Sequence, residues 1–179
     1  MKLKMRLFPS GQLIDPLKPD PDQIELADIA HALSQINRFN GHTRFPYSVG
    51  QHSLLVCDLV PEPAKLEGLM HDAVECYVQD IVLPLKSVDK MAGYREIEDS
   101  WAEAVSKKFE LGMGYWHDEI KLADRKALAT ELKQLVNVDD TVSVDGKVVY
   151  PLDIVIPRML PEVVEDLFIA TFIKLAGDR

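Results

Sequence analysis

The hydrophobic positions of this chain recur with a helical period over most of its length. Apolar side chains spaced three or four residues apart predict amphipathic helices at 21–36, 48–59, 63–75, 90–110, 118–136 and 161–177. Asp20 before Pro21 and Ser48 before Val49 are typical helix starts. Gly112 and Gly177 stand where the periodicity ends. The pattern therefore predicts a mainly helical protein.

Two short stretches break the helical period. Residues 2–16 alternate polar and apolar positions around the turn residues Pro9-Ser10-Gly11, which predicts a short β-hairpin. Asp145-Gly146 lies between β-prone residues and predicts a second small hairpin near 141–150. Residues 81–86 predict a short helix or turn. No repeat or linker interrupts the chain, so we expect a single all-α domain over residues 1–179 with two β excursions.

Composition narrows the classes of partner. The chain has 179 residues, 47% of them hydrophobic, which is enough for one packed core. Its net charge is −9 and it has no basic stripe, so nucleic acid is not expected as a partner. The sequence has neither a signal peptide nor a run of about 20 apolar residues, and it holds only two cysteines, which match no zinc or redox spacing. We therefore expect a cytoplasmic protein without membrane contact.

One polar motif ends an apolar run. His71 and Asp72 are adjacent, so an imidazole nitrogen and a carboxylate oxygen are offered to one divalent metal ion. His52 and Asp124 lie on helix faces that are otherwise apolar, and a buried carboxylate needs a cation or strong donors. These four residues form a mixed nitrogen and oxygen set from three predicted helices. From spacing alone, a packed core histidine and a hydrogen-bonding Asp72 explain the pattern equally well.

Four stretches together resemble the HD superfamily of metal-dependent phosphohydrolases. Within that superfamily the chain is similar to small phage and prophage HD hydrolases and to the bacterial 5′-deoxynucleotidases. The resemblance runs from about Phe8 to Glu131 and implies a helical HD bundle that hydrolyses nucleotide phosphate esters. The stretches are Arg38–His42, Tyr47–Ser53, Leu69–Glu75, and Gln79–Ile81 leading to Pro84-Leu85-Lys86.

The resemblance implies metal and catalytic roles. His52, His71, Asp72 and Asp124 match the metal ligands of the family. Glu75 matches a glutamate that helps activate the attacking water, and a carboxylate near the metal can accept the proton of that water. A solvated acid at a helix end is the alternative for Glu75. Asp80 matches a further acid near the site; a helix N-cap is an equally good interpretation of Asp80.

Four other residues are expected to contact substrate. Arg38 stands where the family has a phosphate-binding arginine, and a guanidinium can hold phosphate through two hydrogen bonds. A cation on the protein surface is the alternative for Arg38. Phe39 replaces a tryptophan that packs where a 2′-hydroxyl would sit in the deoxynucleotidases, so the stringency of deoxyribose selection stays open; a core aromatic is the alternative interpretation of Phe39. His42 can donate to phosphate or stabilise its turn. Lys86 can neutralise phosphate or lie on the surface.

These residues lead us to expect hydrolysis of purine deoxynucleoside 5′-monophosphates to deoxynucleoside and phosphate. A triphosphohydrolase acting on dATP is an alternative, because the same motif serves both reactions. A non-catalytic nucleotide-binding module is a second alternative. Nitrogen ligands favour Co²⁺, Mn²⁺ or Zn²⁺ over Mg²⁺. A homo-oligomer is expected by family analogy.

Overall fold

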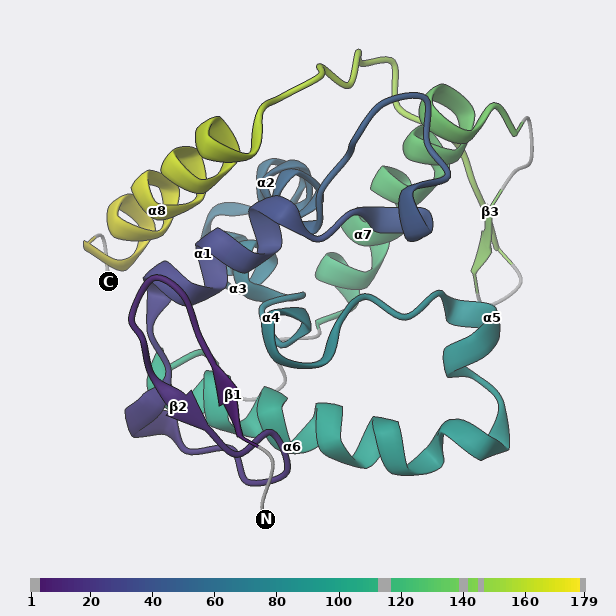
Figure 1. Cartoon of the computed structure of the whole chain (residues 1–179). Coiled ribbons are helices and arrows are strands. Elements are labelled where there is room, and N and C mark those ends of the chain that lie inside the picture. Colours follow the sequence, from purple (N-terminus) through teal and green to yellow (C-terminus); the bar gives the residue numbers. More distant parts are fainter. Residues whose placement is uncertain (1–3, 113–116, 139–141, 145–146, 178–179) are drawn as a thin grey trace.

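The computed structural model describes residues 4–112, 117–138, 142–144 and 147–177. The protein is mostly helical, as the periodicity predicts (Figure 1). Within the described residues no helix is long and apolar enough to cross a membrane. The helices are α1 (Leu26–Gln35), α2 (Val49–Leu59), α3 (Lys65–Met70), α4 (Glu75–Val78), α5 (Leu83–Lys86), α6 (Ala92–Lys108), α7 (Asp118–Glu131), which continues as one π-helical turn (Leu132–Val136), and α8 (Pro161–Gly177).

Helix α2 is central to the bundle and packs against α1, α3, α7 and α8. The main core lies on the side of α1, α3 and α8, where Leu33, Leu69 and Phe168 are fully buried. A second cluster joins α2 to α7 through Val56 and Ile120. Because α2 is covered from several directions, a polar side chain on it is removed from water.

Both predicted hairpins are present. Strands β1 (Met5–Arg6) and β2 (Leu13–Ile14) are antiparallel, with Met5 opposite Ile14. Strands β3 (Val142–Val144) and β4 (Lys147–Val149) form the second antiparallel pair. The Asp145-Gly146 turn lies outside the described residues. The strands are shorter than the predicted stretches, because the alternation of polar and apolar residues continues into the turns.

The predicted helix at 21–36 is wrong in its first turn. Pro21–Gln23 form a 3-10 turn capped by the Asp20 side chain, and the α-helix begins only at Leu26. Ile24 and Glu25 between them are extended, with ψ of 126° and 135°. Ile24 is nevertheless completely buried. Its place in the apolar stripe therefore reflects burial and not helical conformation.

The helix predicted through the His71-Asp72 motif also divides. Helix α3 ends at Met70 and α4 begins at Glu75, with turns between them. In these turns the Ala73 and Glu75 amides donate to carbonyls three residues earlier. The tighter winding changes the direction of successive side chains, so His71, Asp72 and Glu75 point into one region from a very short segment.

Candidate metal centre

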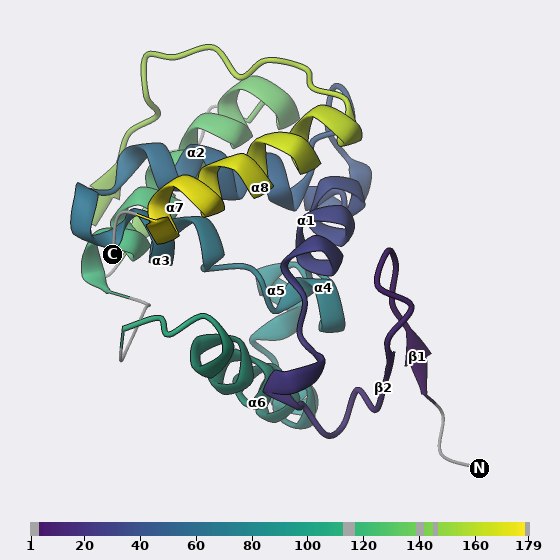
Figure 2. The ribbon, with the colours of Figure 1, turned by 90° about the vertical axis from the view of Figure 1, so that its left-hand side faces the viewer.

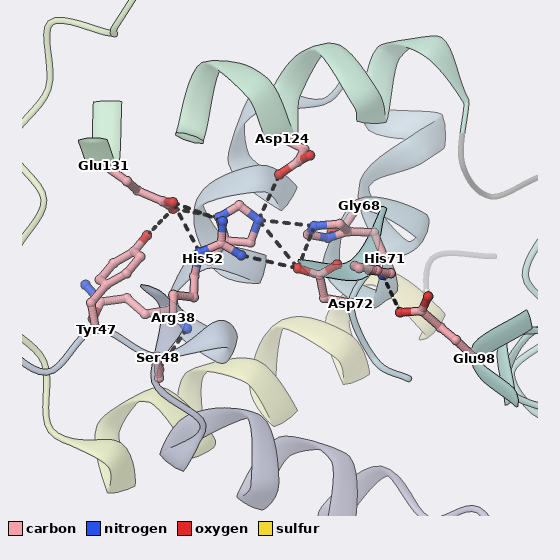
Figure 3. Close-up of polar contacts among 12 residues, drawn as sticks. Arg38, Tyr47, Ser48, His52, Gly68, His71, Asp72, Glu98, Asp124 and Glu131 are labelled. Atoms are coloured by element: carbon pink, nitrogen blue, oxygen red, sulfur yellow. Dashed lines mark hydrogen bonds and ion pairs between the residues drawn. The ribbon is translucent and has the colours of Figure 1, made fainter. Parts of the chain in front are cut away.

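The predicted ligands come from three parts of the bundle (Figure 3). His52 lies in α2, which begins where the Ser48 hydroxyl accepts a hydrogen bond from the Gln51 amide at 3.2 Å. His71 and Asp72 lie in the turns after α3, and Asp124 lies in α7. Sequence-distant residues are thus brought together because α3 and α7 both pack on α2.

The ligand atoms converge closely. One atom each of His52, His71 and Asp72 lies within 4.8 Å of the other two. The His52 Nε2 is 3.2 Å from the His71 Nε2, and the Asp72 Oδ2 is 3.2 Å from the same His71 atom. Asp124 joins at the edge, with its Oδ1 3.2 Å from the His52 Nε2. The structure therefore places all four predicted residues together, with Asp124 as the most exposed of them.

The outer ring nitrogens define the tautomers. The His71 Nδ1 lies 2.8 Å from the Gly68 carbonyl, which can only accept, so Nδ1 donates. The His52 Nδ1 lies 2.6 Å from the Glu131 Oε1 and donates to that carboxylate. When the two rings are neutral, their Nε2 lone pairs face each other and two carboxylates. Histidines that ligate a metal are held in this way by outer hydrogen bonds.

A group of facing acceptors needs positive charge between them. Burial opposes a charge on the His52 ring, but the Glu131 and Asp124 carboxylates outweigh burial and raise the pKa of His52 to about 9. Burial also disfavours charge on Asp72, yet the neighbouring His71, His52 and Arg38 hold the pKa of that carboxyl well below its usual range. The cluster thus attracts a proton strongly, and its donor set fits a divalent cation in place of the proton.

Glu131 is the residue that sequence reasoning missed. Its completely buried carboxylate accepts from the Tyr47 hydroxyl at 2.9 Å and from the His52 Nδ1, and contacts Arg38 at 3.1 Å. Burial alone would raise the pKa of Glu131, but Arg38 and His52 lower it to about 2. The missed signal is its position seven residues after Asp124, two helical turns further along the same face.

Arg38 reaches the centre from the turn that follows α1. Its guanidinium lies 3.1 Å from Glu131 and 3.6 Å from the Asp72 Oδ2. Burial disfavours the charge, but these acids raise the pKa of Arg38 above its usual value. Phe39 follows in a left-handed conformation, with φ of 55°, and the guanidinium lies 5.5 Å from the centre of its ring.

A cavity of about 610 Å³ opens beside the centre. Its polar wall includes the predicted residues Arg38, Asp72, Glu75, Asp80, Lys86 and Asp124. Its apolar wall comes from Phe39, from residues 81–84, and from Leu128 and Leu132. This volume is within the range of small-molecule sites.

Glu75 and Asp80 are the acids of this wall outside the ligand cluster. Glu75 is only 7% exposed, and its Oε2 has no hydrogen-bond partner within the described chain. Burial and the negative charges of Asp72 and Asp80 raise the pKa of Glu75 well above its usual value. Burial likewise raises the pKa of Asp80. Glu75 is thus a carboxyl group with a high proton affinity, aimed at the site.

The two remaining predictions have different outcomes. Lys86 lines the cavity and forms an ion pair with Glu98 of α6. His42 is exposed and does not line the cavity; its amide donates to the Phe39 carbonyl at 2.9 Å. A role for His42 in its turn therefore agrees better with the geometry than contact with a ligand in this cavity.

The chain matches no protein family model. It is 41% identical over 123 residues to the uncharacterized protein YfdR of Escherichia coli (strain K12), covering 69% of this chain and 67% of YfdR. It is 34% identical over 152 residues to the uncharacterized protein RCAP_rcc00048 of Rhodobacter capsulatus, covering 80% of this chain and 70% of that protein. The chain therefore belongs to the family that includes YfdR and RCAP_rcc00048.

Proposed function

We propose that this protein is a metal-dependent phosphohydrolase of the HD superfamily that cleaves deoxynucleoside 5′-monophosphates. One observation carries the proposal: the Nε2 atoms of His52 and His71 face each other and two carboxylates. The Nδ1 atoms of both rings already donate hydrogen bonds, to Glu131 and to the Gly68 carbonyl. His52, His71, Asp72 and Asp124 would hold the ion. A divalent ion bound there would lower the pKa of a water molecule and offset charge on a phosphoryl group.

The chain's own residues have distinct tasks in this reaction. Arg38 presents donors at the cavity wall, held in place by Glu131 and Asp72, and binds the phosphate oxygens. Glu75 accepts a proton from the attacking water as its oxygen bonds to phosphorus. The bond between phosphorus and the 5′ oxygen breaks, the leaving oxygen takes a proton from solvent, and Glu75 releases its proton to solvent. The products are the deoxynucleoside and inorganic phosphate.

Charge around the cavity favours a monophosphate over a triphosphate. Among the described lining residues, Arg38 and Lys86 are the cations, and each already has acidic partners. The same wall holds four acids. A triphosphate would bring much more negative charge to this wall than a monophosphate does. The apolar segment 81–84 suits a base or sugar better than further phosphates.

The test is a panel of deoxy- and ribonucleoside mono- and triphosphates with Mn²⁺, Co²⁺, Zn²⁺ or Mg²⁺. Release of inorganic phosphate from the monophosphates is the expected result, strongest with the first three ions. Triphosphate release would replace the substrate assignment with that of a triphosphohydrolase. Metal binding without turnover of any nucleotide would support a binding module and reject the enzyme.

Two variants separate the roles of the acids. Asp72→Asn should lose metal affinity and turnover together because it removes a charged ligand. Glu75→Gln should keep metal affinity, measured by calorimetry, while turnover falls about 10²- to 10⁴-fold. Glu96→Gln, an exposed position on α6, is the matched control and should change neither. Normal turnover by Glu75→Gln would reject its role as the base.

A further inference from the structure

Helix α8 has an apolar outer face that no other described segment covers. Its inner side buries Val164 and Phe168 against the bundle. Its outer side exposes Val163, Leu167 and Ile173, with exposed fractions of 45%, 43% and 63%. Figure 2 shows α8 lying across the molecule with its outer side toward the viewer. A helix that is apolar on both sides is usually buried on both sides.

The apolar surface continues beyond the helix. Ile154, Val155 and Leu160 precede α8 and are also exposed, Val155 by 87%. A cavity of about 390 Å³ lies between this segment, α2 and α8, with Leu167 on its wall. Exposed apolar surface of this extent marks an interaction site more often than an ordinary surface.

We propose that this surface binds a second copy of the same chain, with the two α8 helices crossing antiparallel at Ala170. Asp166, Ala170 and Lys174 are all exposed and follow one another at four-residue intervals. Residues at this spacing form a single ridge on a helix, and such ridges run parallel when two helices cross at about 50°. The small side chain of Ala170 lets the helices approach closely at the crossing point.

Charge decides in favour of a second copy. Asp166 and Lys174 are equally distant from Ala170 along the ridge, so a two-fold axis at Ala170 places Asp166 of each chain against Lys174 of the other. Within one helix they are eight residues, about 12 Å, apart and do not pair. In the part of the chain that the structure describes, neither side chain forms an ion pair.

The flanking apolar residues fit the same axis. Val163 and Leu167 lie on one side of the ridge, and Ile173 lies on the other. In such an isologous interface, the side of the ridge with Val163 and Leu167 faces the same side of the second chain, and the side with Ile173 likewise faces its counterpart. A standard dimer buries about 800 Å² per partner. The strip on α8 is only about 25 Å long, so Val155 and Leu160 would widen the contact.

The first measurement is the mass in solution by sedimentation or light scattering across a concentration series. The full chain should sediment with twice its mass of 20.2 kDa. Ala170→Glu should reduce the mass to that of one chain, because a charge and a larger side chain enter the crossing point. Its far-ultraviolet circular dichroism should remain that of the wild type, since Ala170 is exposed.

The second measurement uses the two-fold pairing. Asp166→Lys and Lys174→Asp should each weaken self-association at least tenfold, because like charges then meet across the axis. The double variant D166K/K174D should restore it. An equimolar mixture of the two single variants should also form a dimer, since each then supplies the charge that the other needs. Glu96→Lys, with the same change in net charge as Asp166→Lys, should leave association unchanged.

These outcomes do not depend on the proposed activity. A wild-type chain that is monomeric throughout the concentration series would overturn the proposal. This holds also if the monomer binds lipid vesicles through the same surface. A dimer unaffected by Ala170→Glu and by both charge reversals would overturn it as well. Single variants that fail to associate when mixed would rule out the antiparallel register.

Discussion

At the residue scale, Glu131 links a predicted metal ligand, His52, to the predicted phosphate-binding residue, Arg38. Its carboxylate holds His52 through Nδ1 and Arg38 through the guanidinium, while Tyr47 donates to it. The orientation of a predicted metal ligand and that of the predicted phosphate-binding residue therefore depend on one buried charge. In metal sites, replacing a residue that hydrogen-bonds to a metal-binding histidine commonly lowers metal affinity 10- to 100-fold.

Replacing Glu131 by Gln should weaken metal binding and destabilise the fold. The substitution keeps the shape but leaves the partly buried Arg38 and the fully buried His52 without their carboxylate. Removing one partner of a buried pair costs about 3–5 kcal/mol. Tyr47→Phe is the matched control, because it removes one neutral donor from the same carboxylate and costs about 1 kcal/mol. Urea unfolding and metal titration give the two readouts. Equal effects of the two variants would contradict the role of the charge.

The four residues that meet in the candidate cluster were easier to predict from the sequence than their surroundings. His71 and Asp72 form a recognisable dipeptide, and Asp124 stands out as an acid on an apolar helix face. Glu131 gives a weaker signal: it lies two helical turns after Asp124 on the same face, but at the end of α7, where charged residues are common. The left-handed backbone of Phe39 was equally hidden, because aromatic residues rarely adopt positive φ.

At the element scale, periodicity predicted where helices lie but not where they are interrupted. Ala73 and Val74 follow His71-Asp72 at helical spacing from Leu69 and Met70, so the periodicity shows no break between α3 and α4. The turns form because tertiary packing buries both sides of this segment. Ile24 shows the same limit, since it is buried in an extended conformation.

Gly68 of α3 links helix packing to the site. A Cβ at this position would lie 2.7 Å from the Val60 Cγ2 and 3.5 Å from the Cys57 Cα, and the Gly68 carbonyl accepts from His71. Gly68→Ala should therefore destabilise the protein by about 1–3 kcal/mol, although alanine normally favours a helix. Gly93→Ala in α6 meets nothing within 4 Å and should stabilise by up to about 1 kcal/mol. Thermal unfolding compares them, and a stabilised Gly68→Ala would show that α2 and α3 can separate without cost.

At the scale of the whole molecule, the site is an outcome of packing around α2. His52 in α2, Asp124 in α7 and the turns after α3 are far apart in the sequence and meet only in the folded chain. The predicted helices and the resemblance of the His52, His71-Asp72 and Asp124 stretches to the HD pattern together indicated this meeting. They did not indicate where the apolar wall at 81–84 or helix α8 would lie in the fold. Apolar periodicity shows which side of a helix is buried, but not which segment it packs against.

Because the ligand cluster exists only in the folded chain, a bound metal should stabilise the whole molecule. An ion at 100 times its dissociation constant adds about 2.7 kcal/mol to the free energy of unfolding. Protein stripped with chelator should gain this amount from Mn²⁺, Co²⁺ or Zn²⁺ and less from Mg²⁺, since two ligands are nitrogens. His71→Ala should abolish the gain. His117→Ala, an exposed histidine at the start of α7, should retain it. Equal stabilisation of both variants by the ion would place the metal elsewhere in the molecule.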